Sequence, residues 1–342
     1  MLAWGTVWGM EAVMDSVKES AAAAPALELN DLQVAYERTK TFVARTPTVP
    51  AAGLSALTGL EVWLKAELLQ VTGSFKLRGV LNTLLQLDED ERAAGVVSMS
   101  AGNHASALAY GARIAGTRAT VVMPRYASPA KVAATKAYGG EVIQTDQPLA
   151  EVMADVMAKR KLTLVHPFDD PRIIAGAGGV GLELVEDASK LDVIVVPVGG
   201  GGLISGVAAA VRMLSPQTRV IGVEPAWAPG MSSALHAGRP VRLENAQSVA
   251  DGLAAPFAGH HTLACVQSWV DAIVLVDEAE LIAAVGVLAR EAKFAAEAAG
   301  AAGLAALLAG KLDLEPESRV GLVISGGNVD PALLAAAITT PA

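Results

Sequence analysis

Residues 193–205 read Val-Ile-Val-Val-Pro-Val-Gly-Gly-Gly-Gly-Leu-Ile-Ser. The β-branched run at 193–198 is typical of a strand that is buried on both faces of a parallel sheet. Four glycines then lead into a helix predicted over 203–213. Glycines carry no Cβ, and a helix N-terminus favours negative charge, so backbone N–H groups here can close around an anion. The stretch predicts a phosphate-binding loop, with a flexible hinge as the alternative; the residues involved are Gly199, Gly200, Gly201, Gly202 and Leu203.

The alternation of strand and helix extends over most of the chain. Short apolar runs predict strands, and longer periodic segments predict helices between them. Predicted strands are 61–65, 95–98, 120–123, 141–144, 162–165, 193–198, 220–223, 272–276 and 320–324, and predicted helices include 104–115, 129–138 and 149–161. This order indicates an α/β fold with parallel sheets.

A lysine stands at the start of another predicted helix. Residues 72–79 read Thr-Gly-Ser-Phe-Lys-Leu-Arg-Gly, and apolar residues at helical spacing follow. The positive field of a helix N-terminus, together with burial, disfavours an ammonium group and lowers the pKa of Lys76. A neutral amine is what Schiff-base chemistry requires. The alternative is a solvated surface lysine.

Two further turns carry polar side chains at predicted strand ends. Ser100-Ala101-Gly102-Asn103-His104 joins a strand to a helix, and its N–H groups, hydroxyl and amide can hold a small carboxylate. Ser325-Gly326-Gly327-Asn328 also follows a strand, and Ser325 can donate a hydrogen bond to a heterocyclic nitrogen. Ordinary helix caps and turns are the alternatives. Ligands of open α/β sheets collect at the carboxyl ends of strands.

One glycine-rich window has the pattern of a dinucleotide site but the wrong context. Gly176-Ala177-Gly178-Gly179-Val180-Gly181 matches G-x-G-x-x-G, yet 171–175 before it does not read as a strand. The dinucleotide fingerprint requires a strand there. We therefore predict a glycine-rich helix or turn that packs closely on a neighbour.

Composition excludes several classes of partner. The chain has 342 residues and a net charge of -9, without a basic cluster, so a nucleic-acid partner is not expected. Cys265 is the single cysteine, which excludes an internal disulfide and a thiolate metal cluster and fits a reducing, cytoplasmic setting. No window reads as a membrane span or a signal peptide. Residues 1–28 are predicted to be a disordered N-terminal extension, with an arm at an oligomer contact as the alternative.

Together the motifs resemble the fold-type II family of pyridoxal-phosphate enzymes, specifically threonine dehydratase (threonine ammonia-lyase) and serine racemase. The resemblance rests on 73–79, 100–104, 198–203, 222–225, 251–252 and 325–328, in the family's order. It implies pyridoxal 5'-phosphate as cofactor and two domains, each with a mostly parallel sheet flanked by helices. The large, cofactor-binding domain would comprise 29–93 and 166–342, and the small domain 94–165. A homodimer or homotetramer is expected.

The resemblance also assigns roles to residues. Lys76 would form the Schiff base with the cofactor, and Phe75 would pack beside it. The cofactor phosphate would bind the N–H groups of Gly199 to Leu203, Asn103 would bond the ring hydroxyl, and Ser325 the pyridine nitrogen. The turn that holds the substrate carboxylate would be formed by Ser100, Ala101, Gly102, Asn103 and His104.

The implied reaction is an elimination on an amino acid. Lys76 would remove the Cα proton of L-threonine or L-serine, the β-hydroxyl would leave as water, and hydrolysis would give a 2-oxo acid and ammonia. Serine racemase and dehydratases of 3-hydroxyaspartate or phenylserine are alternatives within this class. A non-catalytic pyridoxal-phosphate-binding protein is the alternative outside it.

The chain departs from the family's pattern at several positions. In serine racemases the position that matches Ala101 resembles a second serine, which protonates the opposite face of the substrate Cα. A methyl group cannot transfer a proton, so elimination is favoured over racemisation. Glu224 matches one acid of the family's cation site, but 226–230 contain no second acid, so no divalent metal is expected. A monovalent cation held by carbonyl oxygens stays open. Glu297-Ala298-Ala299-Gly300 replaces the usual Glu-Pro-Ala-Gly. The chain ends soon after 325–328, like the short form without a regulatory domain, so no isoleucine inhibition is expected.

Overall fold

Two β-sheets flanked by helices make up the described part of the chain. The computed structural model describes residues 27–188 and 190–339. The large sheet has six strands in the order β1 (Thr48–Pro50), β2 (Glu61–Lys65), β10 (Arg319–Val323), β7 (Val193–Pro197), β8 (Arg219–Pro225) and β9 (Ala272–Val276). The small sheet has four, in the order β5 (Glu141–Thr145), β4 (Ala119–Pro124), β3 (Val96–Met99) and β6 (Thr163–Leu164).

The strand pairing confirms the predicted α/β fold. All pairs are parallel except β1 with β2, and each predicted strand is present with ends shifted by at most two residues. The antiparallel edge strand β1 was not predicted, because it has only three residues and ends in a proline.

Helices cover both sheets. Those around the large sheet are α2 (Leu29–Thr39), α3 (Ala52–Thr58), α9 (Pro171–Asp187), α10 (Gly202–Leu214), α11 (Gly230–Ala237), α12 (His260–Trp269), α13 (Glu278–Val287), α14 (Ala298–Leu308) and α15 (Pro331–Thr339). The short turns of helix are η1 (Glu67–Leu69), η2 (Asp251–Leu253) and the π-helical η3 (Leu288–Ala292). Near the small sheet lie α4 (Lys76–Leu84), α5 (Glu89–Ala94), α6 (Asn103–Ala115), α7 (Pro129–Ala137) and α8 (Leu149–Arg160).

Strand β7 shows why its sequence is continuously apolar. Val193 and Val195 face the cluster built by α13 and α14, whereas Ile194 and Val196 face the cluster built by α10 and α12. All of its residues are buried. A strand between two helical layers has no solvent face, so apolar and polar residues do not alternate along it.

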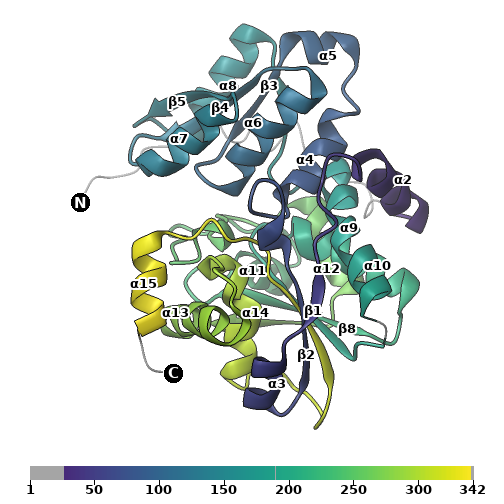
Figure 1. Ribbon diagram of the computed structural model, residues 1–342. Helices are drawn as coiled ribbons and strands as arrows, with labels where there is room; N and C mark the ends of the chain where they lie inside the picture. The colour runs from purple at the N-terminus through teal and green to yellow at the C-terminus, as the bar shows by residue number, and fades with distance from the viewer. Residues whose placement is uncertain (1–26, 189, 340–342) are drawn as a thin grey trace.

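Helix α4 lies between the two sheets (Figure 1). Leu77, Val80 and Leu84 share a core cluster with Leu108 and other residues of α6, beside the small sheet. On its other side α4 packs on α9, where a Cβ on Gly79 would lie 2.6 Å from the carbonyl oxygen of Ile173. The helix that begins with Lys76 therefore connects the two halves of the molecule.

The window with the dinucleotide pattern is a helix, as predicted. Residues 176–181 lie inside α9. A Cβ on Gly176 would lie 2.7 Å from the carbonyl oxygen of Arg78, and one on Gly178 would lie 2.6 Å from Leu32. These glycines let α9 approach α4 and α2 more closely than any side chain would allow.

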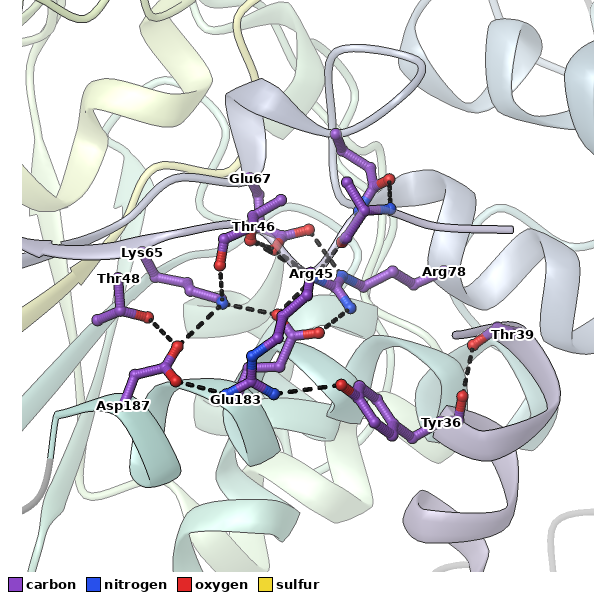
Figure 2. A network of polar contacts seen from close by, with 12 residues as sticks. Tyr36, Thr39, Arg45, Thr46, Thr48, Lys65, Glu67, Arg78, Glu183 and Asp187 are labelled. Atoms are coloured by element: carbon purple, nitrogen blue, oxygen red, sulfur yellow. Dashed lines mark hydrogen bonds and ion pairs between the residues drawn. The ribbon is translucent and has the colours of Figure 1, made fainter. Parts of the chain in front are cut away.

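A buried network of charges fixes α4 to the large sheet (Figure 2). Arg78 donates two hydrogen bonds of 2.8 Å to the carboxylate of Glu67 and two of 2.8 Å to that of Glu183. Lys65 donates to Glu183 (2.6 Å) and to the carbonyl oxygen of Thr46 (2.7 Å). The four charged residues are each at most 1% exposed. Arg78 thus meets both carboxylates in bidentate geometry, and Lys65 adds a second cation. We call these four residues the buried charge network and assign it an anchoring role.

Three further expectations concern the N-terminal extension, membrane spans and the division into domains. Residues 1–26 of the expected N-terminal extension lie outside the described residues, while Leu27 is buried and the backbone N–H of Glu28 donates to Asp31. In the described ranges, none of the helices combines the length and apolar content needed to cross a membrane. The proposed division into two domains stays a prediction.

Candidate active site

Lys76 is the first residue of α4 and is partly buried. Its Nζ donates to the carbonyl oxygen of Pro167 (2.7 Å) and lies 5.1 Å from the centre of the Phe75 ring. Burial lowers the pKa of Lys76 to about 8, although the charge of Glu297 acts to raise it. The predicted direction of the pKa shift is confirmed, and burial is its main cause.

One short segment, residues 167–168, contacts both Lys76 and the glycine loop at 199–202. Pro167 accepts the lysine hydrogen bond, and the next residue, Phe168, fits against the loop: a Cβ on Gly200 would lie 2.3 Å from its ring. Gly201 has φ +95°, a conformation that favours glycine. The backbone N–H groups of residues 199–201 make no hydrogen bond to any other residue that the structure describes. These free donors precede the 13-residue helix α10, whose first turn contains Leu203, as a phosphate site requires.

Ser325 follows β10 and is hydrogen-bonded to the residue before Lys76. It is buried, and its carbonyl oxygen accepts from the backbone N–H of Phe75 (3.1 Å). Ser74 and Gly326 form a β-bridge beside this bond. Within residues 27–188 and 190–339 no other group is hydrogen-bonded to the Ser325 hydroxyl, so it is available to a ligand.

Asn103, the first residue of α6, connects the small sheet to the large one. Its Nδ2 donates to Glu297 Oε1 (2.6 Å), and its Oδ1 accepts from Asn328 Nδ2 (2.7 Å). Asn328 Nδ2 also donates to the carbonyl oxygen of Thr72 (3.0 Å). The turns at 72–79, 100–104 and 325–328, predicted separately from the sequence, are thus hydrogen-bonded to one another.

Glu297 is a site residue that the sequence did not reveal. It is 8% exposed and is the N-cap of α14, where a glutamate reads as an ordinary helix start. Burial raises the pKa of Glu297 to about 7, the hydrogen bond from Asn103 lowers it, and Asp251 raises it further. The available signal was its place in the altered Glu-Ala-Ala-Gly motif.

The turn at 100–104 offers neutral donors rather than a cation. Gly102 N–H donates to Ser100 Oγ (3.2 Å), and a Cβ on Gly102 would meet no atom within 4 Å, so there is open space beside the turn. His104 Nε2 lies 3.0 Å from Ser98 Oγ and 3.3 Å from the carbonyl oxygen of Val165. Burial lowers the pKa of His104 to about 3, so its ring is neutral. Ala101 packs against the core cluster of α4 and α6.

His166 is a second residue that sequence reasoning missed. Its Nδ1 accepts from the backbone N–H groups of Asp169 (2.8 Å) and Phe168 (3.3 Å), and its ring meets that of Phe168 edge to face. Burial lowers the pKa of His166 to about 4. The neutral ring holds the segment that contacts both Lys76 and the glycine loop. No motif in the neighbouring sequence indicates this role.

Glu224 serves as a cap for a helix. Its two oxygens accept from the backbone N–H groups of Met231 (2.7 Å) and Ser232 (2.8 Å), and Ser232 Oγ also donates to it (2.6 Å). Burial raises the pKa of Glu224, and these bonds lower it. Across the described residues, no group of three or more His, Cys, Asp or Glu gathers in a way that could hold a metal ion. The expectation about divalent metals stays a prediction.

Comparisons with known proteins agree with this geometry. Residues 39–326 match the family model "Pyridoxal-phosphate dependent enzyme". The chain is 44% identical to L-threonine ammonia-lyase of Thermotoga maritima, over 89% of this chain and 76% of the relative. It is 38% identical to a serine racemase of Arabidopsis thaliana, over 89% and 94%. The crystal structure of T.th. threonine deaminase superposes with a TM-score of 0.84 at 40% identity, over 89% and 99%. The chain therefore belongs to the pyridoxal-phosphate dependent enzymes of fold type II, as its motifs predicted.

Proposed function

We propose that this protein is an ammonia-lyase that converts L-threonine or L-serine to 2-oxobutyrate or pyruvate and ammonia. The observation that carries the proposal is Lys76, whose amine has a pKa of about 8 and donates to Pro167, next to the Phe168 that packs on the glycine loop. The preceding residue, Phe75, is hydrogen-bonded to Ser325. The similarity to L-threonine ammonia-lyase and to threonine deaminase supports the choice of reaction.

The residues present fit pyridoxal phosphate. The N–H groups of Gly199 to Leu203 would hold its phosphate, where Phe168 leaves no room for a Cβ on Gly200. Ser325 would bond the pyridine nitrogen, Asn103 the ring oxygen, and Phe75 would pack beside the ring. Bound pyridoxal phosphate supplies an aldehyde that captures amines and a ring that withdraws electrons. Ser325, unlike an aspartate, does not keep a pyridine nitrogen protonated, which favours prompt loss of a β-substituent.

Lys76 carries the proton transfer. A group with a pKa near the working pH exists in part as the neutral amine, so Lys76 can accept the proton from the substrate Cα. The substrate carboxylate would meet the N–H groups, hydroxyl and amide of the turn at 100–104, because the neutral His104 offers no positive charge. The β-hydroxyl would take up one proton and leave as water, which balances the proton that Lys76 takes from Cα, and hydrolysis would release the 2-oxo acid and ammonia.

The deciding test is a 2-oxo acid assay with L-threonine, L-serine, 3-hydroxyaspartate and phenylserine. We expect turnover of L-threonine or L-serine and a loss of about 10³-fold or more in Lys76→Ala, since the general base is removed. Absence of 2-oxo acid from every substrate, or an active Lys76→Ala enzyme, would exclude the mechanism.

Serine racemase is the second candidate, and Ala101 argues against it. A methyl group at this position cannot transfer a proton, which leaves Lys76 as the group that the motifs assign to Cα. We expect incubation with L-serine to yield pyruvate with D-serine as a minor product, measured by chiral chromatography. Rapid formation of D-serine would instead favour the racemase.

The sequence also supports proposals about the assembly and the location of the enzyme. A homodimer or homotetramer follows from the resemblance, and a cytoplasmic setting from the single cysteine. Sedimentation equilibrium of the purified chain would measure the first. A monomer under assay conditions would rule out both oligomers.

A further inference from the structure

Both ends of the Asn103 amide are engaged. An asparagine side chain has one acceptor oxygen and two N–H donors, and its two ends are nearly identical in shape. Here Oδ1 accepts from Asn328, and one N–H of Nδ2 donates to Glu297. One further N–H of Nδ2 is left for a ligand.

The partners at each end fix which way the amide points. The carbonyl oxygen of Thr72 can only accept, so Asn328 must present Nδ2 to it, and the same Nδ2 reaches Asn103 Oδ1. An ionised carboxylate can also only accept, so Glu297 requires Nδ2 of Asn103 on its side. A hydrogen-bond chain with acceptors at both ends has one consistent orientation, and its members polarise one another.

We propose that Glu297 is a positioning residue, which holds the Asn103 amide with an N–H directed at the ring oxygen of the cofactor. This inference rests on the proposed role of Asn103 toward pyridoxal phosphate. Glu297 itself is held firmly: its backbone N–H donates to the carbonyl oxygen of Gly326 (3.2 Å), and a Cβ on Gly326 would lie 2.2 Å from its Oε1. The carboxylate therefore has little freedom to leave Asn103.

The protonation state of Glu297 decides how strongly the amide is held and polarised. A protonated carboxyl still has an oxygen that can accept from Nδ2 of Asn103, and Asn328 keeps Oδ1 on its own side, but a neutral partner holds and polarises the amide less than a carboxylate does. The charged groups that act on Glu297 are Lys76 on α4, Lys131 on α7 and Asp251 on η2. Lys131 and Asp251 form an ion pair with each other, and Lys76 has its own acceptor in Pro167. With a pKa of about 7 for Glu297, contact with the ring oxygen strengthens as the pH rises through neutrality.

The test uses two ligands that cannot react with Lys76. Pyridoxine 5'-phosphate keeps the phosphate and ring hydroxyl but has an alcohol in place of the aldehyde; its 3-deoxy analogue lacks the ring hydroxyl. The ratio of their dissociation constants, from calorimetric titration of the cofactor-free full-length chain, isolates the ring-oxygen contact. For the wild type we expect a ratio of about 10 at pH 8.5, as for one hydrogen bond to a polarised donor, and a several-fold smaller ratio at pH 6.

The variants separate the bond from the charge. Glu297→Ala should bring the ratio close to 1 at both pH values, and Glu297→Gln, which can still accept but does not titrate, should give the same ratio at both. Asn328→Ala, at an exposed position, should also lower the ratio and serves if the Glu297 variants do not fold. Glu278→Gln is the matched control, because its carboxylate accepts from Ser248 and Val249 outside the site, and it should match the wild type.

Each outcome decides the matter. A wild-type ratio in Glu297→Ala or in Asn328→Ala, or a wild-type pH dependence in Glu297→Gln, overturns the inference. If neither ligand binds the wild type, the proposed cofactor site itself fails, and the inference fails with it. Normal binding of the 3-deoxy analogue together with an unchanged ratio would overturn the inference alone.

Discussion

Glu67 and Glu297 are both buried glutamates, yet their surroundings give them opposite properties. Burial acts to raise the pKa of Glu67, but the charge and hydrogen bonds of Arg78, with Lys65, outweigh it and hold that pKa below its usual range. Glu297 has a neutral amide as its direct partner, and burial raises its pKa to about 7. A buried carboxylate with a fixed cation at hydrogen-bond distance therefore stays ionised and can anchor, whereas one without such a cation can take up a proton near neutral pH.

Both sites act on the same short helix. The buried charge network holds Arg78, in the first turn of α4, while Glu297 acts electrostatically on Lys76 at its start. One site fixes the helix in place, and the other tunes the amine that the helix presents. The predictions below test this division of roles.

The largest effect is expected from removing Arg78, one of the two cations of the buried charge network. Arg78→Met leaves Glu67 and Glu183 buried with Lys65 as their remaining cation. Uncompensated buried charge should lower the free energy of unfolding by about 3–5 kcal/mol, measured by urea denaturation. Lys159→Met, which removes an exposed ion pair with Asp155, should change it by less than about 0.5 kcal/mol. A loss below about 1 kcal/mol in Arg78→Met would show that the network is not an anchor.

The same substitution should have opposite signs at the two glutamates. Glu67→Gln removes a charge that Arg78 needs and should cost about 2–3 kcal/mol at pH 8. The pKa of Glu297 is higher in the folded chain than in the unfolded one, so its contribution to the free energy of unfolding is lost as the pH rises from 4.5 through about 7. Glu297→Gln removes this loss. Between about pH 5 and pH 8 the free energy of unfolding of the variant should therefore rise by roughly 2 kcal/mol relative to that of the wild type. Equal signs for both variants in the cofactor-free chain would break the comparison.

The smallest effect is expected on the Lys76 amine. The negative charge of Glu297 acts to raise the pKa of Lys76, so Glu297→Gln should move its titration below about 8, by roughly half a unit. Labelling of the cofactor-free chain with an amine reagent over a pH series, read by mass spectrometry, measures the midpoint. The reactive fraction near neutral pH should rise two- to three-fold, and Glu278→Gln should leave it unchanged. A midpoint that moves upward would contradict the electrostatic link.

The parts of the molecule that the sequence could predict are local. The strand β7 and the turns at 199–202, 100–104 and 325–328 each follow from a few adjacent residues. The missing parts depend on partners far along the chain: Asn103 and Glu297 are 194 residues apart, and Arg78 and Glu183 are 105 apart. The motif at 297–300 marks Glu297 but not its partner Asn103, and His166 stands in no motif.

The glycines of α9 also determine where this chain can vary. Gly176 faces the backbone of Arg78, Gly178 faces Leu32, and Gly181 would place a Cβ 2.8 Å from that of Ala210. One added methyl group at each position would displace a different neighbour. Gly176→Ala would push α4 outward and move Lys76 relative to the loop at 199–202. The glycine-rich window at 176–181 thus sets the distance between α9 and its neighbours. The space between the backbones, and not the chemistry of a ligand, limits which residues can stand there.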